Sequence, residues 1–261
     1  MLRLALNTVL PLFVGLLLAA PGFAADGQAV GVNPDASVRL SGKDRILTVG
    51  ADISLGEQVV TGPSGQVQII FSDKTRLVVG PGSALVIESY LFNGSTADKF
   101  AINALAGSFR FISGQSPKPA YSIKTPTASI AVRGTKFDFN VGPRQTDLML
   151  YEGAVRLCAT SGQCQELMAR CALGSVNASL AQLIDHTNPS HGPLSQEFRY
   201  ARFQTPLLSQ FRVSGAGQCA QPPERQDVPA TLAPSSGGAS SGQPTGNGTT
   251  TPVTRFSTFG N

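Results

Sequence analysis

The sequence has few of the residues on which most enzymes and nucleic-acid-binding proteins depend. It contains only two histidines, His186 and His191, among 261 residues. It has no nucleophile elbow, no phosphate-binding loop and no metal-binding histidine motif. Its 20 Lys and Arg residues exceed its 16 Asp and Glu residues, for a net charge of +4, but they form no basic run. These absences argue against catalysis, a bound cofactor and nucleic-acid binding.

Long apolar runs are also scarce, and the one that occurs lies at the N-terminus. Arg3 is the only charge before an apolar stretch at residues 9–20, and small residues follow at Gly22 and Ala24, where a signal peptidase cleaves. The stretch is shorter than the ~20 residues that cross a bilayer. We therefore expect residues 1–24 to be a cleaved signal peptide. Because no second apolar span follows, we expect a periplasmic or secreted protein without a stable membrane span.

Four cysteines follow the expected signal peptide, at Cys158, Cys164, Cys171 and Cys219. An exported chain meets an oxidising compartment, so two disulfides are expected. Of the three connectivities that four cysteines allow, we favour Cys158–Cys164, which closes a turn, and Cys171–Cys219, which ties the C-terminal segment to the body. A zinc site is the alternative, but the spacing is not that of two close pairs. We therefore expect no metal.

Short apolar runs separated by turn residues recur after a loop-like start at residues 26–35. In one of them, Val67, Ile69 and Phe71 recur with the two-residue period of a strand. Residues 36–158 contain many such runs and no helical period, so they predict one all-β body. Because the apolar residues favour one face, the sheet must close on itself or pack against another.

Residues 90–99 are expected to form an irregular loop within this body. The loop begins with three bulky apolar residues, Tyr90, Leu91 and Phe92. Two interpretations are open: the three side chains pack in the core, which we favour, or they form an exposed platform for a ligand.

The C-terminal part of the chain has two different patterns. Residues 159–220 form an extension in which apolar residues recur at helical spacing at 179–186 and again at 194–208, where Pro206 breaks the second helix. We expect these short helices to cap an open end of the β-body. Residues 221–261 are rich in Pro, Ser, Gly and Thr and are expected to be a disordered tail.

Residues 125–139 organise the rest of the chain. Apolar residues alternate at even positions before a break and at odd positions after it, namely Ala128, Ile130 and Val132, then Phe137 and Phe139. An unbroken strand would place the second set on the opposite face of the sheet. Gly134 lies between the two halves and can take backbone angles closed to other residues, so we predict a β-bulge there.

This segment is the centre of a resemblance to a known family. Its core is Thr125-Pro-Thr-Ala-Ser-Ile-Ala-Val-Arg-Gly-Thr-Lys-Phe137, followed by Tyr151-Glu-Gly-Ala-Val155. Together with pieces at residues 59–62, 71–77 and 80–83, this core resembles the FecR domain of bacterial envelope proteins. The resemblance covers roughly residues 47–158, within the all-β body predicted at 36–158.

The resemblance implies a fold and a class of function. FecR domains look like a twisted β-solenoid or a compact two-sheet roll of short strands. We therefore expect a non-enzymatic binding or scaffold module of the cell envelope, with a protein or an envelope polysaccharide such as peptidoglycan as its ligand. The alternative is a component of a cell-surface signalling or transport-regulation system. An envelope hydrolase is disfavoured, because no catalytic constellation is present.

Four residues of the FecR-like core are candidates for a structural or binding role. Gly134 and Gly153 are expected where the backbone turns sharply. Arg133 either contacts a ligand, because its guanidinium suits carboxylates and phosphates, or clamps carbonyl groups left free at the bulge, which we favour. Glu152 is predicted to be the ion-pair partner of Arg133.

Asp138 and Glu152 are the carboxylates that come closest to a catalytic pair, provided that they face each other across neighbouring strands. We favour the interpretation that these acids face solvent and alternate with buried neighbours, here Phe137 and Phe139.

Overall fold

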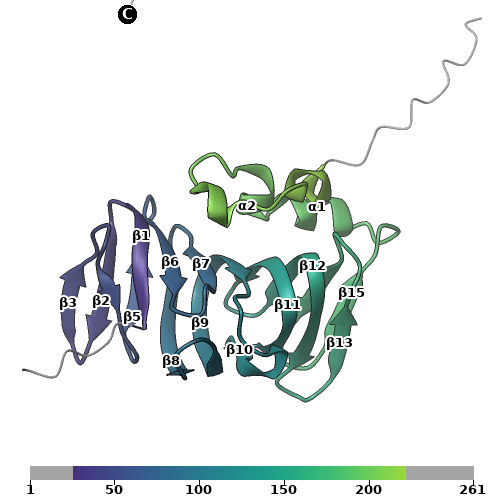
Figure 1. Ribbon diagram of the computed structural model, residues 1–261. Helices are drawn as coiled ribbons and strands as arrows, with labels where there is room; N and C mark the ends of the chain where they lie inside the picture. Colours follow the sequence, from purple (N-terminus) through teal and green to yellow (C-terminus); the bar gives the residue numbers. More distant parts are fainter. Residues whose placement is uncertain (1–25, 222–261) are drawn as a thin grey trace, which may run out of the picture. The chain divides into compact units, whose positions relative to one another are not determined.

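The structure is a computed structural model that describes residues 26–221. The predicted signal peptide and the predicted tail beyond Gln221 lie outside the described residues. The described chain consists largely of strands, and short α-helices follow only near its C-terminal end (Figure 1). The predicted all-β class is therefore confirmed.

Fifteen strands form one continuous hydrogen-bonded sheet within the described residues. In chain order the strands are β1 (Gly27–Asn33), β2 (Ala36–Leu40), β3 (Lys43–Ile46), β4 (Asp52–Ile53), β5 (Gln58–Thr61), β6 (Gln66–Phe71), β7 (Arg76–Val79), β8 (Ala84–Phe92), β9 (Ala97–Ile112), β10 (Tyr121–Lys124), β11 (Ala128–Val141), β12 (Thr146–Ala159), β13 (Cys164–Leu167), β14 (Leu173–Val176) and β15 (Ala181–Ile184). A 3-10 turn, η1 (Lys118–Ala120), precedes β10.

Three long strands, β9, β11 and β12, divide the sheet into two layers. Residues 97–106 of β9 pair with β8, whereas residues 107–112 pair with β7 and β11. We call the layer β4-β1-β6-β7-β9-β11-β12-β14-β15 the covered layer and the layer β3-β2-β5-β8-β9-β10-β11-β12-β13 the open layer. Within the described chain only β9 and β10 pair in parallel. A solenoid stacks parallel strands, so the predicted solenoid is not confirmed.

The main core lies between the two layers and contains a chain of aromatic rings. Phe109 and Phe139 stack with 4.9 Å between ring centroids, and the centroids of Phe111 and Phe137 lie 5.4 Å apart. All four side chains are fully buried. The contacts follow from strand register, because the members of each pair lie opposite each other on β9 and β11. The inward orientation predicted for Phe137 and Phe139 is confirmed.

The predicted bulge is present in β11. Its register with β12 shifts between Arg133 and Lys136, and Gly134 has a φ of 68°. Gly153 on β12 has a φ of 85°, and a Cβ added there would stand 2.0 Å from the Gly134 carbonyl oxygen. Both positive φ values favour glycine. The two glycines therefore let β11 and β12 bend together from one layer into the other.

The predictions made for three segments from local pattern alone are wrong. Residues 26–35 contain β1 rather than a loop, because β1 pairs with β4 and β6. Residues 90–99 contain the end of β8 and the start of β9, with Tyr90 buried and Leu91 and Phe92 exposed. Residues 179–186 contain β15 rather than a helix, because β15 pairs with β14. In each case pairing with another strand outweighs the local preference.

The helical character predicted for residues 194–208 is confirmed only in part, because both α-helices end before Pro206, and their position differs from the predicted one. α1 (His191–Gln196) and α2 (Arg199–Arg202) are followed by the 3-10 turns η2 (Ser209–Phe211) and η3 (Ala216–Ala220). They pack on the outer face of the covered layer rather than on an open end of the body (Figure 1). We call residues 191–221 the cap. None of the helices within residues 26–221 has the length and apolar character needed to cross a bilayer.

Gly153→Ala is expected to destabilise the protein by more than about 2 kcal/mol. A left-handed backbone costs alanine ~1–2 kcal/mol, and the new methyl group would also meet the carbonyl oxygen of Gly134. Gly162→Ala is the matched control, because Gly162 has a φ of 94° but no atom within 4 Å of an added Cβ. Urea denaturation should show the larger loss for Gly153→Ala. Equal losses would contradict the close approach of β11 and β12.

Candidate functional site

One row of side chains crosses the outer face of the covered layer beneath the cap. Strand register places seven side chains side by side on neighbouring strands: Gln68, Val78, Arg110, Asp138, Met149, Leu173 and Ile184. All seven are buried, and cap residues such as Phe198 and Phe211 pack in the same apolar clusters. We call these seven residues the covered row. They form a second core, which is mostly apolar but contains opposite charges at its centre.

Arg110 and Asp138 form a bidentate ion pair at the centre of the covered row. Arg110 Nε donates to Asp138 Oδ1 at 2.6 Å, and Nη2 donates to Oδ2 at 2.9 Å. The Tyr151 hydroxyl donates to Asp138 Oδ2 at 2.6 Å. The cap completes the network, because Arg110 Nη1 donates to Gln204 Oε1 and, at 3.3 Å, to the Phe211 carbonyl oxygen. The two charges therefore neutralise each other inside the fold.

The predictions made for Asp138 from the sequence are wrong. Asp138 is 2% exposed rather than facing solvent, and its neighbour on β12 is Met149 rather than Glu152. The available signal was a charge between two phenylalanines in each strand, Phe109-Arg110-Phe111 and Phe137-Asp138-Phe139. Because the phenylalanines face the main core, the charges must face outward. No sequence pattern indicates that the cap buries that outer face.

A second buried acid, Asp73, holds the turn between β6 and β7. Its carboxylate accepts hydrogen bonds from the Thr75 backbone N–H at 3.0 Å and from the hydroxyls of Ser116 at 2.6 Å and Tyr121 at 2.8 Å. Its own backbone N–H donates to the Tyr90 hydroxyl at 2.9 Å. The cluster ties this turn to the segment before β10, which is a structural role.

Arg133 is exposed, and its guanidinium has no hydrogen-bond partner among residues 26–221. The predicted clamp is therefore not formed. Ser113 holds the bulge instead: its backbone N–H donates to the Thr135 carbonyl oxygen at 3.0 Å, and its hydroxyl accepts from the Thr135 N–H at 2.9 Å. Glu152 pairs with Lys136 at 2.5 Å and not with Arg133, so the predicted ion pair is also wrong.

A hollow of about 550 Å³ lies beside Arg133. Its other lining residues are Pro119, Tyr121, Ala131 and Val132. The hollow lies where β10 and the first half of β11 belong to the open layer. An exposed guanidinium thus stands at the rim of this depression.

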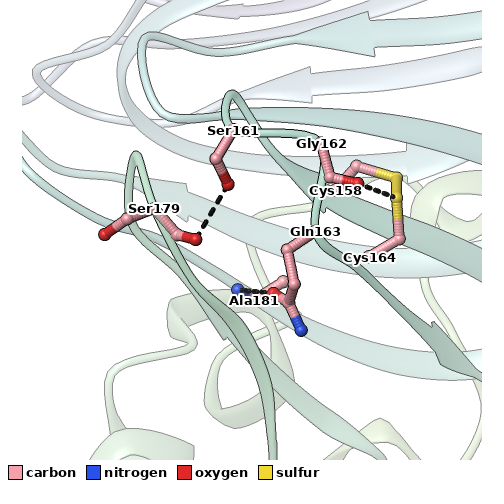
Figure 2. The surroundings of a disulfide bond; sticks show 7 residues. All are labelled: Cys158, Ser161, Gly162, Gln163, Cys164, Ser179 and Ala181. Atoms are coloured by element: carbon pink, nitrogen blue, oxygen red, sulfur yellow. Dashed lines mark hydrogen bonds between the residues drawn. A yellow bond between two sulfur atoms is a disulfide. The ribbon is translucent and has the colours of Figure 1, made fainter.

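Both predicted disulfides are present. Cys158 and Cys164 are cross-strand neighbours on β12 and β13. Figure 2 shows the hairpin around this bond, where the Ser161 hydroxyl donates to the Ser179 carbonyl oxygen at 2.8 Å. The second bond, Cys171–Cys219, joins the segment before β14 to η3 of the cap. The cap is therefore fixed to the sheet covalently as well as by packing.

The two histidines line one cavity of about 820 Å³ beside the cap. The ring centroids of His186 and His191 lie 4.1 Å apart, and burial lowers the pKa of His191. The part of the chain that the structure describes has no group of three or more His, Cys, Asp or Glu side chains placed to hold a metal ion. The two histidines therefore share one hollow, and within residues 26–221 they are not part of a group of three potential metal ligands.

Removing one partner of the buried ion pair is expected to cost much more stability than removing both. Asp138→Leu leaves Arg110 buried without its counter-charge, which typically costs ~3–5 kcal/mol. Arg110→Met combined with Asp138→Leu should recover most of that loss, because two apolar side chains need no partner. Urea denaturation of both variants measures the difference.

Asp44→Ala is the matched control, because Asp44 forms an ion pair with Arg39 in which both side chains are about half exposed (50% and 51%). Its stability should stay close to that of the native protein. A double variant as unstable as Asp138→Leu would contradict the role assigned to the pair.

Alkaline pH is expected to destabilise the protein as its tyrosines ionise. Burial, reinforced by the charge of Asp138, raises the pKa of Tyr151 and of Tyr200, and burial raises the pKa of Tyr90 to about 12. Above the ordinary value of 10.0 the unfolded phenols lose protons that the folded protein keeps, so stability falls as pH rises. Tyr200→Phe should reduce this slope by up to ~1.4 kcal/mol per pH unit. An unchanged slope in unfolding measurements above pH 10 would contradict this.

Comparison with known proteins gives one family match. Residues 57–156 match the family model described as FecR protein. A search of curated proteins found no match.

Several solved structures resemble the chain. Two crystal structures from Parabacteroides distasonis, each described as a candidate anti-sigma factor, share 12% and 14% identity with it, with TM-scores of 0.41 and 0.39. Each alignment covers 53% of this chain, and the chain spans 62% and 63% of those proteins. A third, described as a cell surface anchoring domain, is 36% identical over 24% of this chain and 83% of its own, with a TM-score of 0.23.

The matched range coincides with the central part of the two-layered sheet. It begins one residue before β5 and ends within β12, so it includes the bulge at Gly134 and the facing Gly153. It also contains both members of the buried ion pair, Arg110 and Asp138. The chain is therefore a FecR domain-containing protein, and its FecR domain occupies residues 57–156.

Proposed function

We propose that this protein is an exported, non-enzymatic binding module of the cell envelope, and that its FecR domain presents the binding surface. The family match supports the envelope assignment. The two disulfides support export, because disulfides persist mainly in oxidising compartments. The proposed activity uses no metal or cofactor.

The observation that carries this proposal is the exposure of Arg133. Ser113 already satisfies the backbone at the bulge, so the fold does not need the guanidinium there. An exposed arginine presents a planar fork of donors that suits carboxylate groups. This geometry favours the ligand-contact hypothesis for Arg133 over the clamp hypothesis.

The surroundings of Arg133 indicate what kind of ligand it would bind. The hollow beside it is lined by Pro119, Ala131, Val132 and Tyr121. Ligand sites commonly combine an apolar lining with a few placed polar groups that fix orientation. We therefore propose a ligand group that has a carboxylate next to an apolar part, on an envelope protein or on an envelope polysaccharide such as peptidoglycan.

A second candidate function is a component of a cell-surface signalling or transport-regulation system. The family match favours it, because FecR domains are named after such a regulator. The two candidates differ in the N-terminus, since a retained apolar stretch at residues 9–20 would restore a membrane-anchored role. N-terminal sequencing of the protein recovered from the envelope distinguishes them: cleavage near Ala24 supports the binding module.

Arg133→Ala is expected to abolish partner capture without lowering the melting temperature, because the side chain is exposed and contributes no hydrogen bond to the described fold. Arg133→Lys should weaken capture less, since an ammonium keeps the charge but loses the fork. The matched control is Arg144→Ala, another exposed arginine, which lies in the β11–β12 turn.

The measurements are pull-down from envelope extract, sedimentation with purified peptidoglycan and thermal melting. A fall in melting temperature with capture retained would favour the clamp and contradict the proposal. Equal loss of capture in Arg133→Ala and Arg144→Ala would show that net charge, rather than this site, is responsible.

A further inference from the structure

The cap presents to solvent a turn with apolar side chains. Residues 203–208 connect α2 to η2, and Phe203 and Leu208 are 56% and 41% exposed. Pro206 between them is also exposed. The Leu207 backbone N–H closes the turn by donating to the Gln204 carbonyl oxygen at 3.0 Å. We call residues 203–208 the cap turn. It follows α2 directly in the chain, and α2 is labelled in Figure 1.

Two side chains hold the cap turn in one conformation. Gln68 of the covered row accepts a hydrogen bond from the Leu208 N–H at 2.8 Å. Arg212 donates to the carbonyl oxygens of Leu207 and Thr205 at 2.8 and 2.9 Å. The exposed apolar side chains are thus presented by a fixed backbone. Binding through them would order little further chain, which favours affinity.

Arginines surround the cap turn, and the described residues place no carboxylate within ion-pair distance of them. The Arg202 guanidinium carbon lies 5.0 Å from the centroid of the Phe203 ring. Arg76 of β7 donates to the Gln210 carbonyl oxygen at 3.0 Å. Between positions 191 and 221 the sequence has one acid, Glu197, and three arginines. The apolar turn is therefore bordered by positive charge that no neighbouring acid neutralises.

We propose that the cap turn docks onto an anionic lipid surface. Apolar side chains bordered by arginines are what an interfacial contact requires, because the apolar groups enter the acyl boundary while the cations meet phosphate headgroups. An acidic polypeptide without an apolar patch would satisfy the arginines but not an exposed Phe203 and Leu208. Because the cap covers the covered layer, docking would leave the hollow beside Arg133, on the open layer, available to its own ligand.

The absence of tryptophan from the sequence allows a direct test. Phe203→Trp, introduced into the protein in its naturally processed form, adds one fluorophore at the turn. Its emission should shift to shorter wavelength with vesicles of phosphatidylcholine and phosphatidylglycerol in equal parts, and not with phosphatidylcholine alone. Phe92→Trp is the matched control, because Phe92 is 40% exposed but lies at the end of β8. No shift for Phe203→Trp, or the same shift for both, would overturn the proposal.

Vesicle co-sedimentation gives an independent measure. Phe203→Ala with Leu208→Ala should lower binding at least about tenfold, and Arg202→Gln should lower it about fivefold on the anionic vesicles. Leu91→Ala with Phe92→Ala should leave binding unchanged. The substituted side chains are all exposed, and thermal melting checks that each variant folds.

Two further outcomes separate this proposal from its alternatives. Binding to poly-L-glutamate without binding to either vesicle would overturn the proposal of lipid docking and indicate an acidic protein surface as the partner. Arg133→Ala should bind the anionic vesicles as the native protein does. Loss of vesicle binding in Arg133→Ala would contradict the assignment of lipid contact to the cap turn.

Discussion

The relation between cap and sheet depends on the bidentate ion pair of Arg110 and Asp138. Both side chains are almost fully removed from water, so an arrangement that leaves either one unpaired is strongly disfavoured. The pair joins β9 to β11, and the remaining donors of Arg110 reach Gln204 and Phe211 in the cap. A cap docked on the same face in a shifted position would lose these contacts while still covering the charges. We infer that the pair does more to fix the cap in one docking position than to raise the net stability of the fold.

The two-layer architecture follows from three long strands that each change layer at a glycine. The positive φ values are 108° at Gly107 in β9, 68° at Gly134 in β11 and 85° at Gly153 in β12. A strand that bends sharply needs backbone angles that residues with a Cβ atom rarely adopt. Within the covered layer, the two-residue period of β9 and β11 turns the phenylalanines inward and the charges outward.

Much of this fold was predictable from the sequence, and the failures have a common physical cause. Periodicity was sufficient for the strands around Phe137 and Phe139 and for the bulge at Gly134, because these features are local. It failed for β1 and β15, which exist because a distant strand pairs with them. It failed also at the site. Arg133 is exposed because Ser113, twenty positions earlier, already binds the bulge, and Asp138 is buried because the cap covers it.

The covalent closure of the cap has a consequence for the order in which the molecule matures. Cys158 and Cys164 are 6 positions apart and meet as soon as one hairpin forms, whereas Cys171 and Cys219 are 48 positions apart. The second pair of thiols encloses β14, β15, α1 and α2, so native pairing needs the cap to reach back to the sheet. Oxidation at that position therefore requires the cap to lie against the sheet, and a chain in which it has not occurred is distinguishable by two free thiols.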